Sequence, residues 1–179
     1  MTRPALKVCG VADMAFAAYA ASHGADIIGV IFATRSPRRV ELTRAIEIAS
    51  AARMASPGVR IAGVFAGEDV AQIIDTARAV PLDIVQLHDT RYTAGDAAEI
   101  SKARFEIWAL SASGASAASD AVLFDGKDGD ACGGTGRLAD WEAAAAAKAA
   151  GRQIGRASCR EHPRRARHRG RCDRCQQRD

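Results

Sequence analysis

Short apolar runs alternate with longer segments of helical periodicity along the first 150 residues of the chain. The run at residues 27–32, IIGVIF, is too apolar to face water on either side and is typical of a buried parallel strand. Strands are predicted on this basis at residues 5–9, 27–32, 61–65, 84–87, 105–110 and 121–124. Helices are predicted at residues 13–23, 42–54, 70–80, 94–103 and 141–150.

This order of strands and helices predicts a parallel α/β fold. The repeat of about 25–30 residues is near that of a (β/α)8 TIM barrel, in which roughly 250 residues form eight units. Residues 152–179 contain one isoleucine and no valine, leucine or phenylalanine, so we expect no further strand with a core face. We therefore predict an incomplete TIM-barrel-type domain of about six β/α units over residues 1–151, followed by a disordered basic tail over residues 152–179.

Positive charge is concentrated in that tail. Residues 152–179 hold ten arginines and three acidic residues, a balance of +7, so the other 151 residues carry −3 of the total of +4. Binding of a polyanion would rest on the tail alone, and we do not expect nucleic-acid binding by the body of the protein.

Two residue pairs in the tail, Cys159 with His162 and Cys172 with Cys175, have the spacing of zinc ligands. A small zinc module also needs some apolar residues to pack, and the tail lacks them, so we predict no metal site. The abrupt change in composition after Gly151 favours a frameshift in a GC-rich gene as the origin of the tail, a hypothesis that sequencing the gene would test.

The sequence predicts no membrane span, because no window of about 18 residues is uninterruptedly apolar. The first ten residues lack the apolar core of a signal peptide, so we expect a cytoplasmic location. An odd number of cysteines, five, without such a signal argues against a disulfide framework.

Reactive side chains follow several of the predicted strands. Cys9 follows the first strand, Arg38 lies in the loop after the second, His88 follows the fourth and Asp125 the sixth, and a glycine-rich loop comes next with Gly133, Gly134, Thr135 and Gly136. Taken singly, each has a plain interpretation as an inert thiol, a solvated arginine, a capping group or a turn residue. Together they point to one site, because the carboxyl ends of parallel barrel strands share one face.

Five ordered segments then resemble those of phosphoribosylanthranilate isomerases over about 140 residues. They are Lys7-Val8-Cys9-Gly10, Gly29-Val30-Ile31-Phe32 with Ser36-Pro37-Arg38, Gly63-Val64-Phe65, Val85-Gln86-Leu87-His88, and Leu123-Phe124-Asp125 with the loop of residues 133–136 and Asp140-Trp141. Asp89 stands where the family usually has glycine, and Leu138-Ala139 replaces the common aromatic residue before Asp140.

The resemblance implies an Amadori rearrangement in tryptophan biosynthesis, with a phosphosugar as substrate and without a metal or an organic cofactor. N-(5-phosphoribosyl)anthranilate would become 1-(2-carboxyphenylamino)-1-deoxyribulose 5-phosphate. By the resemblance, Asp125 is the general acid, Cys9 the general base, and Arg38 the residue that binds the anthranilate carboxylate. The resemblance also implies that His88 forms a wall of the site and that Gly133, Gly134, Thr135 and Gly136 lie in a loop over the substrate.

Three alternatives stay open at this stage. The family's phosphate-binding turns after strands seven and eight have no counterpart after residue 150, so we expect an isomerase with reduced turnover, or one active only after association or completion in trans. The chain could instead be an inactive, truncated barrel whose basic tail binds polyanions, which salt-dependent binding lost on deletion of residues 153–179 would reveal. A different phosphosugar isomerase, or a lyase of the same pathway, is the third alternative, and the pairing of Cys9 with Asp125 disfavours it.

Overall fold

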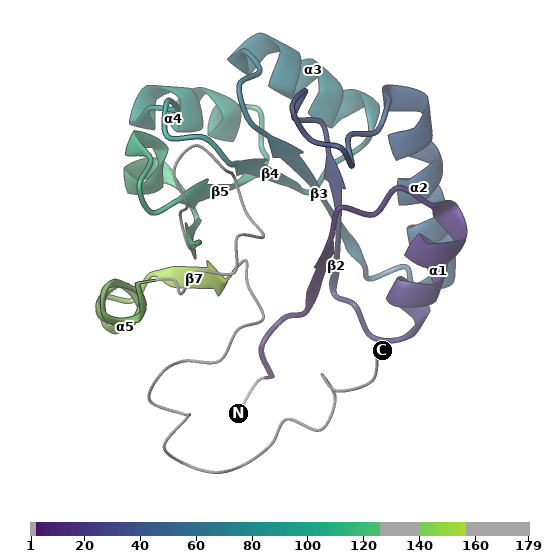
Figure 1. The fold of residues 1–179 in the computed structure, drawn as a ribbon, viewed down its shortest axis with the longest axis horizontal. Coiled ribbons are helices and arrows are strands. Elements are labelled where there is room, and N and C mark those ends of the chain that lie inside the picture. Colours follow the sequence, from purple (N-terminus) through teal and green to yellow (C-terminus); the bar gives the residue numbers. More distant parts are fainter. Residues whose placement is uncertain (1–2, 126–139, 157–179) are drawn as a thin grey trace.

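Seven parallel strands form one sheet in the order of the sequence, in a computed structural model that describes residues 3–125 and 140–156. The strands are β1 (Lys7–Cys9), β2 (Ile27–Ile31), β3 (Arg60–Phe65), β4 (Ile84–Leu87), β5 (Glu106–Leu110), β6 (Ala121–Phe124) and β7 (Gln153–Arg156). The sheet curls, and its helices lie outside the curl (Figure 1). This is the architecture of an incomplete (β/α) barrel, as predicted, with β1 and β7 at the two ends of the strand order.

The helices connect the strands as the periodicity predicts. They are α1 (Met14–Ser22), α2 (Leu42–Ala55), α3 (Val70–Ala79), α4 (Ala94–Lys102) and α5 (Trp141–Ala149). Side chains at the start of three of them accept hydrogen bonds from otherwise unpaired backbone N–H groups: Asp13 from Phe16, Thr93 from Asp96 and Asp140 from Ala143. None of the helices in the described ranges is long and apolar enough to cross a bilayer.

The expectation that no further strand follows residue 151 is wrong, because β7 pairs in parallel with β6 over Gln153–Arg156. One apolar side chain is enough for this strand: Ile154 packs against a small cluster formed by Val122, Phe124 and Ala144. The sequence did not predict β7, because its four residues lie within a segment of 28 residues that is mostly polar as a whole. The unpaired edge of β6 supplies the backbone hydrogen bonds, which any residue other than proline can complete.

The connection between β5 and β6 also differs from the other crossovers. A five-residue 3-10 helix, η1 (Gly114–Ala118), replaces the α-helix. The buried Ser113 fixes its start, accepting from the Ala115 N–H and donating to the Tyr92 carbonyl. A crossover this short is too brief for a full α-helix, so a tighter single turn closes it.

Each strand divides its side chains between two faces. Outward side chains such as Ile61, Val85 and Ile107 are fully buried under the helices in the main core. Side chains of the opposite parity form a smaller cluster inside the curl, composed of Ile27, Ala62, Ile84, Trp108, Leu110, Ala121 and Leu123. The inner face is therefore mostly apolar, and a polar side chain buried there needs a hydrogen-bond partner.

An aspartate precedes every second strand and ties it to the strand before. Asp26, Asp83 and Asp120 each accept a hydrogen bond of 2.7 Å from a backbone N–H in or beside the preceding strand: Leu6, Ile61 and Ile107, respectively. Arg3 also pairs with Asp26 and, with the Leu6 N–H, holds the pKa of that carboxyl below its ordinary value. These bonds lie at the amino ends of the strands, where a barrel places groups that stabilise the fold.

Replacing Asp83 with Ala is expected to lower the free energy of unfolding by about 1–3 kcal/mol. The Ile61 N–H would lose its side-chain acceptor, and Arg53 would lose a carboxylate 2.9 Å away. Urea denaturation followed by circular dichroism measures the change. Asp75→Ala, at an exposed position of α3, is the matched control and should shift the value by no more than about 0.5 kcal/mol. Equal effects of the two substitutions would contradict the assigned role of Asp83.

Candidate active site

The catalytic residues predicted from the sequence lie at the carboxyl ends of β1 and β6. Cys9 is the last residue of β1 and is an exposed free thiol. Asp125 directly follows β6, and its side chain is only 8% exposed. Both residues have the parity of the inner face, because Cys9 pairs in register with Gly29, two residues after Ile27, and Asp125 lies two residues after Leu123.

His88 joins Asp125 from the end of β4. Its Nε2 lies 3.5 Å from the Asp125 Oδ2, and its side chain is 12% exposed. A carboxyl group with so little exposure to water interacts strongly with a polar group beside it. The two residues, predicted separately from their positions after strands, thus form one unit at the carboxyl end of the sheet.

Two polar residues that the predicted site did not include extend this unit across the inner face. The Gln86 side chain, 5% exposed, lies with its Nε2 3.2 Å from the His88 Nδ1. Lys7 Nζ donates to Gln86 Oε1 and lies 5.5 Å from the centre of the Trp108 ring. Burial lowers the pKa of the Lys7 ammonium, while the neighbouring Cys9 thiol acts in the opposite direction.

The sequence carried a signal for these two residues. Lys7 and Gln86 are polar residues at inward positions of otherwise apolar strands, and each lies two residues before a predicted site residue. Side chains two apart on a strand share a face. An isolated polar residue in a buried strand therefore marks a position whose partner lies on another strand.

Arg38, the predicted anion-binding residue, lies beside the end of β1. Its Nη1 donates to the Cys9 carbonyl at 3.4 Å, so the guanidinium sits beside the end of β1. Gly10 makes this approach possible: its φ is +78°, and a Cβ there would lie 2.4 Å from Arg38 Nη1. The exposed guanidinium is thereby held at the backbone of the residue that carries the exposed thiol, and its donors match a carboxylate.

The glycine-rich loop predicted to cover the substrate, with Gly133, Gly134, Thr135 and Gly136, lies outside the described residues. So do the Cys-His and Cys-Cys pairs of the tail. Among residues 3–125 and 140–156, no three histidine, cysteine, aspartate or glutamate side chains are grouped so that they could hold a metal ion.

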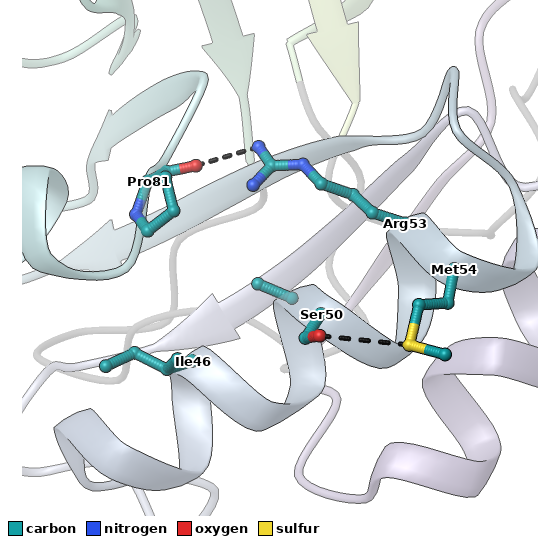
Figure 2. A pocket seen from close by; sticks show the side chains of 6 residues that line it. Ile46, Ser50, Arg53, Met54 and Pro81 are labelled. Atoms are coloured by element: carbon teal, nitrogen blue, oxygen red, sulfur yellow. Dashed lines mark hydrogen bonds between the residues drawn. The ribbon is translucent and has the colours of Figure 1, made fainter.

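A separate pocket lies on the helical exterior (Figure 2). Its lining residues are Ile46, Ala49, Ser50, Arg53, Met54 and Pro81. Arg53 already donates to the Pro81 carbonyl at 2.8 Å and pairs with Asp83. Since Pro81 and Asp83 precede β4 whereas His88 follows it, this pocket is at the opposite end of the strands from the reactive groups.

Residues 6–155 match the family described as N-(5'phosphoribosyl)anthranilate (PRA) isomerase. The chain belongs to this family. The match reaches into β7, in agreement with the seventh strand.

Individual members of the family are also similar in sequence to this chain. The chain is 36% identical over 153 residues to N-(5'-phosphoribosyl)anthranilate isomerase of Pelobacter propionicus, covering 83% of this chain and 72% of that protein. Across relatives of this kind the chain spans 66% to 72% of their length.

Solved isomerases of the family share the fold. The phosphoribosyl anthranilate isomerase of Thermotoga maritima superposes with a TM-score of 0.71 at 22% identity, over 87% of this chain and 77% of that one. A family member in complex with reduced 1-(o-carboxyphenylamino)-1-deoxyribulose 5-phosphate superposes with a TM-score of 0.60 at 25% identity, over 70% of this chain and 66% of that one.

Proposed function

We propose that this chain catalyses the isomerisation of N-(5-phosphoribosyl)anthranilate to 1-(2-carboxyphenylamino)-1-deoxyribulose 5-phosphate in tryptophan biosynthesis. The observation that carries the proposal is the position of Cys9 and Asp125 at the carboxyl ends of β1 and β6, on the inner face of the sheet, in a chain of this family. Cys9 supplies an exposed thiol, and Asp125 supplies a carboxyl group with little exposure to water. The related structure with a reduced form of that product bears on the substrate class, because its ligand is a phosphosugar joined to an anthranilate group.

The first step opens the ribose ring. Asp125, as the general acid, gives its proton to the ring oxygen while the C1′–O bond breaks and the anilino nitrogen lone pair forms a C=N bond. A carboxyl group that is largely withdrawn from water suits this role, because few water molecules can reach it to compete with the ring oxygen for its proton. The products of the step are an iminium ion and the Asp125 carboxylate, which His88 faces.

The second step moves a proton from carbon to sulfur. Cys9, as the thiolate, removes the proton from C2′, the C–H electrons form the C1′=C2′ bond, and the iminium electrons return to nitrogen. The resulting enol becomes the ketone when C1′ takes up a proton and the 2′-hydroxyl releases one, so substrate and product contain the same atoms. A proton that passes from the Cys9 thiol to solvent and from solvent to the Asp125 carboxylate restores the starting state. Arg38 would hold the anthranilate carboxylate beside these groups through paired N–H donors, and His88 would form a wall of the site.

The test is fluorescence-monitored turnover of N-(5-phosphoribosyl)anthranilate by the purified full chain, beside a Cys9→Ala, Asp125→Ala double variant. We expect the substrate signal to decay in the parent and to follow the uncatalysed rate in the double variant. A parent no faster than the double variant would overturn the proposal for this chain. The reduced turnover expected from the sequence depends on residues after Arg156, outside the described residues, and stays a prediction.

A further inference from the structure

A chain of polar side chains crosses the apolar inner face from β1 to β6. It runs from Lys7 Nζ to Gln86 Oε1, from Gln86 Nε2 to His88 Nδ1 at 3.2 Å, and from His88 Nε2 to Asp125 Oδ2 at 3.5 Å. Its members come from three strands that are not neighbours in the sheet. Hydrophobic side chains such as Ile84, Trp108 and Leu123 pack on the same face, so the polar contacts within the chain lie in largely apolar surroundings.

The direction of the hydrogen bonds from Lys7 to Gln86 and from Gln86 to His88 follows from the chemistry of their end groups. The Lys7 ammonium has donors only, so the Gln86 oxygen must face it. The Gln86 amide nitrogen, also a donor only, is then the atom that faces His88. His88 Nδ1 must accept, and the ring proton of a neutral imidazole is left on Nε2, the nitrogen that faces Asp125.

Lys7 also lies beside the other member of the acid–base pair. Lys7 and Cys9 are two residues apart on β1, and both side chains pack over Gly29. A Cβ on Gly29 would lie 3.0 Å from the Lys7 Cε and 2.9 Å from the Cys9 Sγ. The missing side chain at Gly29 therefore lets the ammonium group and the thiol share one small space on the inner face.

We propose that Lys7 and Gln86 are positioning residues for the acid–base pair, with Lys7 beside Cys9 and, through Gln86, directing the His88 Nε2–H toward Asp125. The catalytic consequence rests on the proposed function, and the bond directions do not. During the reaction a negative charge moves from the Cys9 sulfur to the Asp125 carboxylate. The chain has a cation at its starting point and an N–H donor at its end point, so it favours both charged forms.

The bond directions are tested by ¹⁵N NMR of the full chain labelled at histidine, with His88→Asn to assign the His88 signals. In the parent we expect an unprotonated Nδ1 and a protonated Nε2. Gln86→Glu keeps the size of the side chain but replaces the amide donor with an acceptor, so His88 Nδ1 should become protonated. A protonated Nδ1 in the parent, or an unprotonated Nδ1 in the variant, would overturn the proposed chain of bonds. This readout needs no turnover, so its failure is distinct from failure of the proposed function.

The positioning role is tested by kinetics on the full chain. Lys7→Met and Gln86→Glu should each lower kcat about 10- to 100-fold, the range of a weakened acid–base step, with KM within about threefold. Lys7→Met with Gln86→Met replaces both bonded partners by apolar groups of similar length, so the melting temperature should stay within about 5 °C of the parent. If kcat recovered together with stability in this double variant, the two residues would be structural and the proposal would be overturned.

The contact between Lys7 and Cys9 has its own test. Iodoacetamide reacts with the thiolate, which a nearby ammonium favours, so Lys7→Met should slow alkylation of Cys9 by about tenfold at pH 7. Peptide mass spectrometry separates Cys9 from the four other cysteines. Equal alkylation rates in parent and variant would contradict an influence of Lys7 on the thiol.

Discussion

Replacing Asp125 with Asn is expected to lower kcat by about 10³-fold, within the range for loss of a general acid. An amide has nearly the same shape as the carboxyl group but has no acidic proton to give to the ribose ring oxygen. Because the side chain is 8% exposed, water has little access to take its place. Steady-state turnover, followed by the loss of substrate fluorescence, measures the effect.

The matched control for this variant is Asp89→Asn. Asp89 directly follows His88, but its carboxylate pairs with Arg91 at 3.3 Å, so kcat should change by no more than about twofold. An Asp125→Asn variant that kept a tenth of the parental kcat would contradict the role of Asp125 as general acid.

The same assay separates the two members of the pair. Cys9→Ala should lower kcat to a similar degree, because the C2′ proton then has no base. Groups that act in one reaction sequence lose little more when both are removed, so the double variant should be no more than about tenfold slower than the slower single variant. Fully multiplicative losses would show that Cys9 and Asp125 act independently.

The second large effect is expected at Arg38. Arg38→Met should raise KM for the substrate by about 10- to 100-fold, because the anthranilate carboxylate loses charge-assisted hydrogen bonds worth about 1.5–3 kcal/mol. The proton-transfer groups stay in place, so kcat should fall much less. Arg39→Met is the control, since Arg39 is the next residue and its guanidinium pairs with Glu41 at 3.4 Å.

A substitution that leaves Arg38 itself intact gives an independent test of its placement. Gly10→Ala would put a Cβ 2.4 Å from the Arg38 Nη1, at a backbone position whose φ of +78° also disfavours alanine. The guanidinium must move away from the Cys9 carbonyl, so KM should rise in the same direction as in Arg38→Met. A large increase for Arg38→Met without any increase for Gly10→Ala would contradict the importance of this contact.

Much of the fold follows from local pattern. The predicted strand at residues 84–87 has the same bounds in the structure, and the predicted helix at residues 70–80 differs by one residue from α3. These elements are specified by apolar periodicity and by turn residues close in sequence, which a single pass along the chain can detect. β7 was not predicted because it is stabilised mainly by backbone pairing with β6 and by contacts with residues distant in sequence.

The candidate site divides in the same way. The sequence predicts that Cys9, Arg38, His88 and Asp125 lie at one end of the sheet, because parallel strands in a barrel bring their carboxyl ends to one face. The hydrogen-bond partners of these residues could not be predicted from the sequence. Lys7 and Gln86 are 79 residues apart, and their contact depends on how strongly the sheet curls.

By itself, the sequence determined the order of strands and helices and the positions of the candidate site residues after the strands. All of these depend on periodicity and on neighbours within a few residues. Only the tertiary structure decided that β7 completes the edge of β6, that Arg38 lies over Gly10, and that a chain of polar side chains joins Lys7 to Asp125. These features are set by the curvature and packing of strands distant in sequence, which determine which buried polar groups meet.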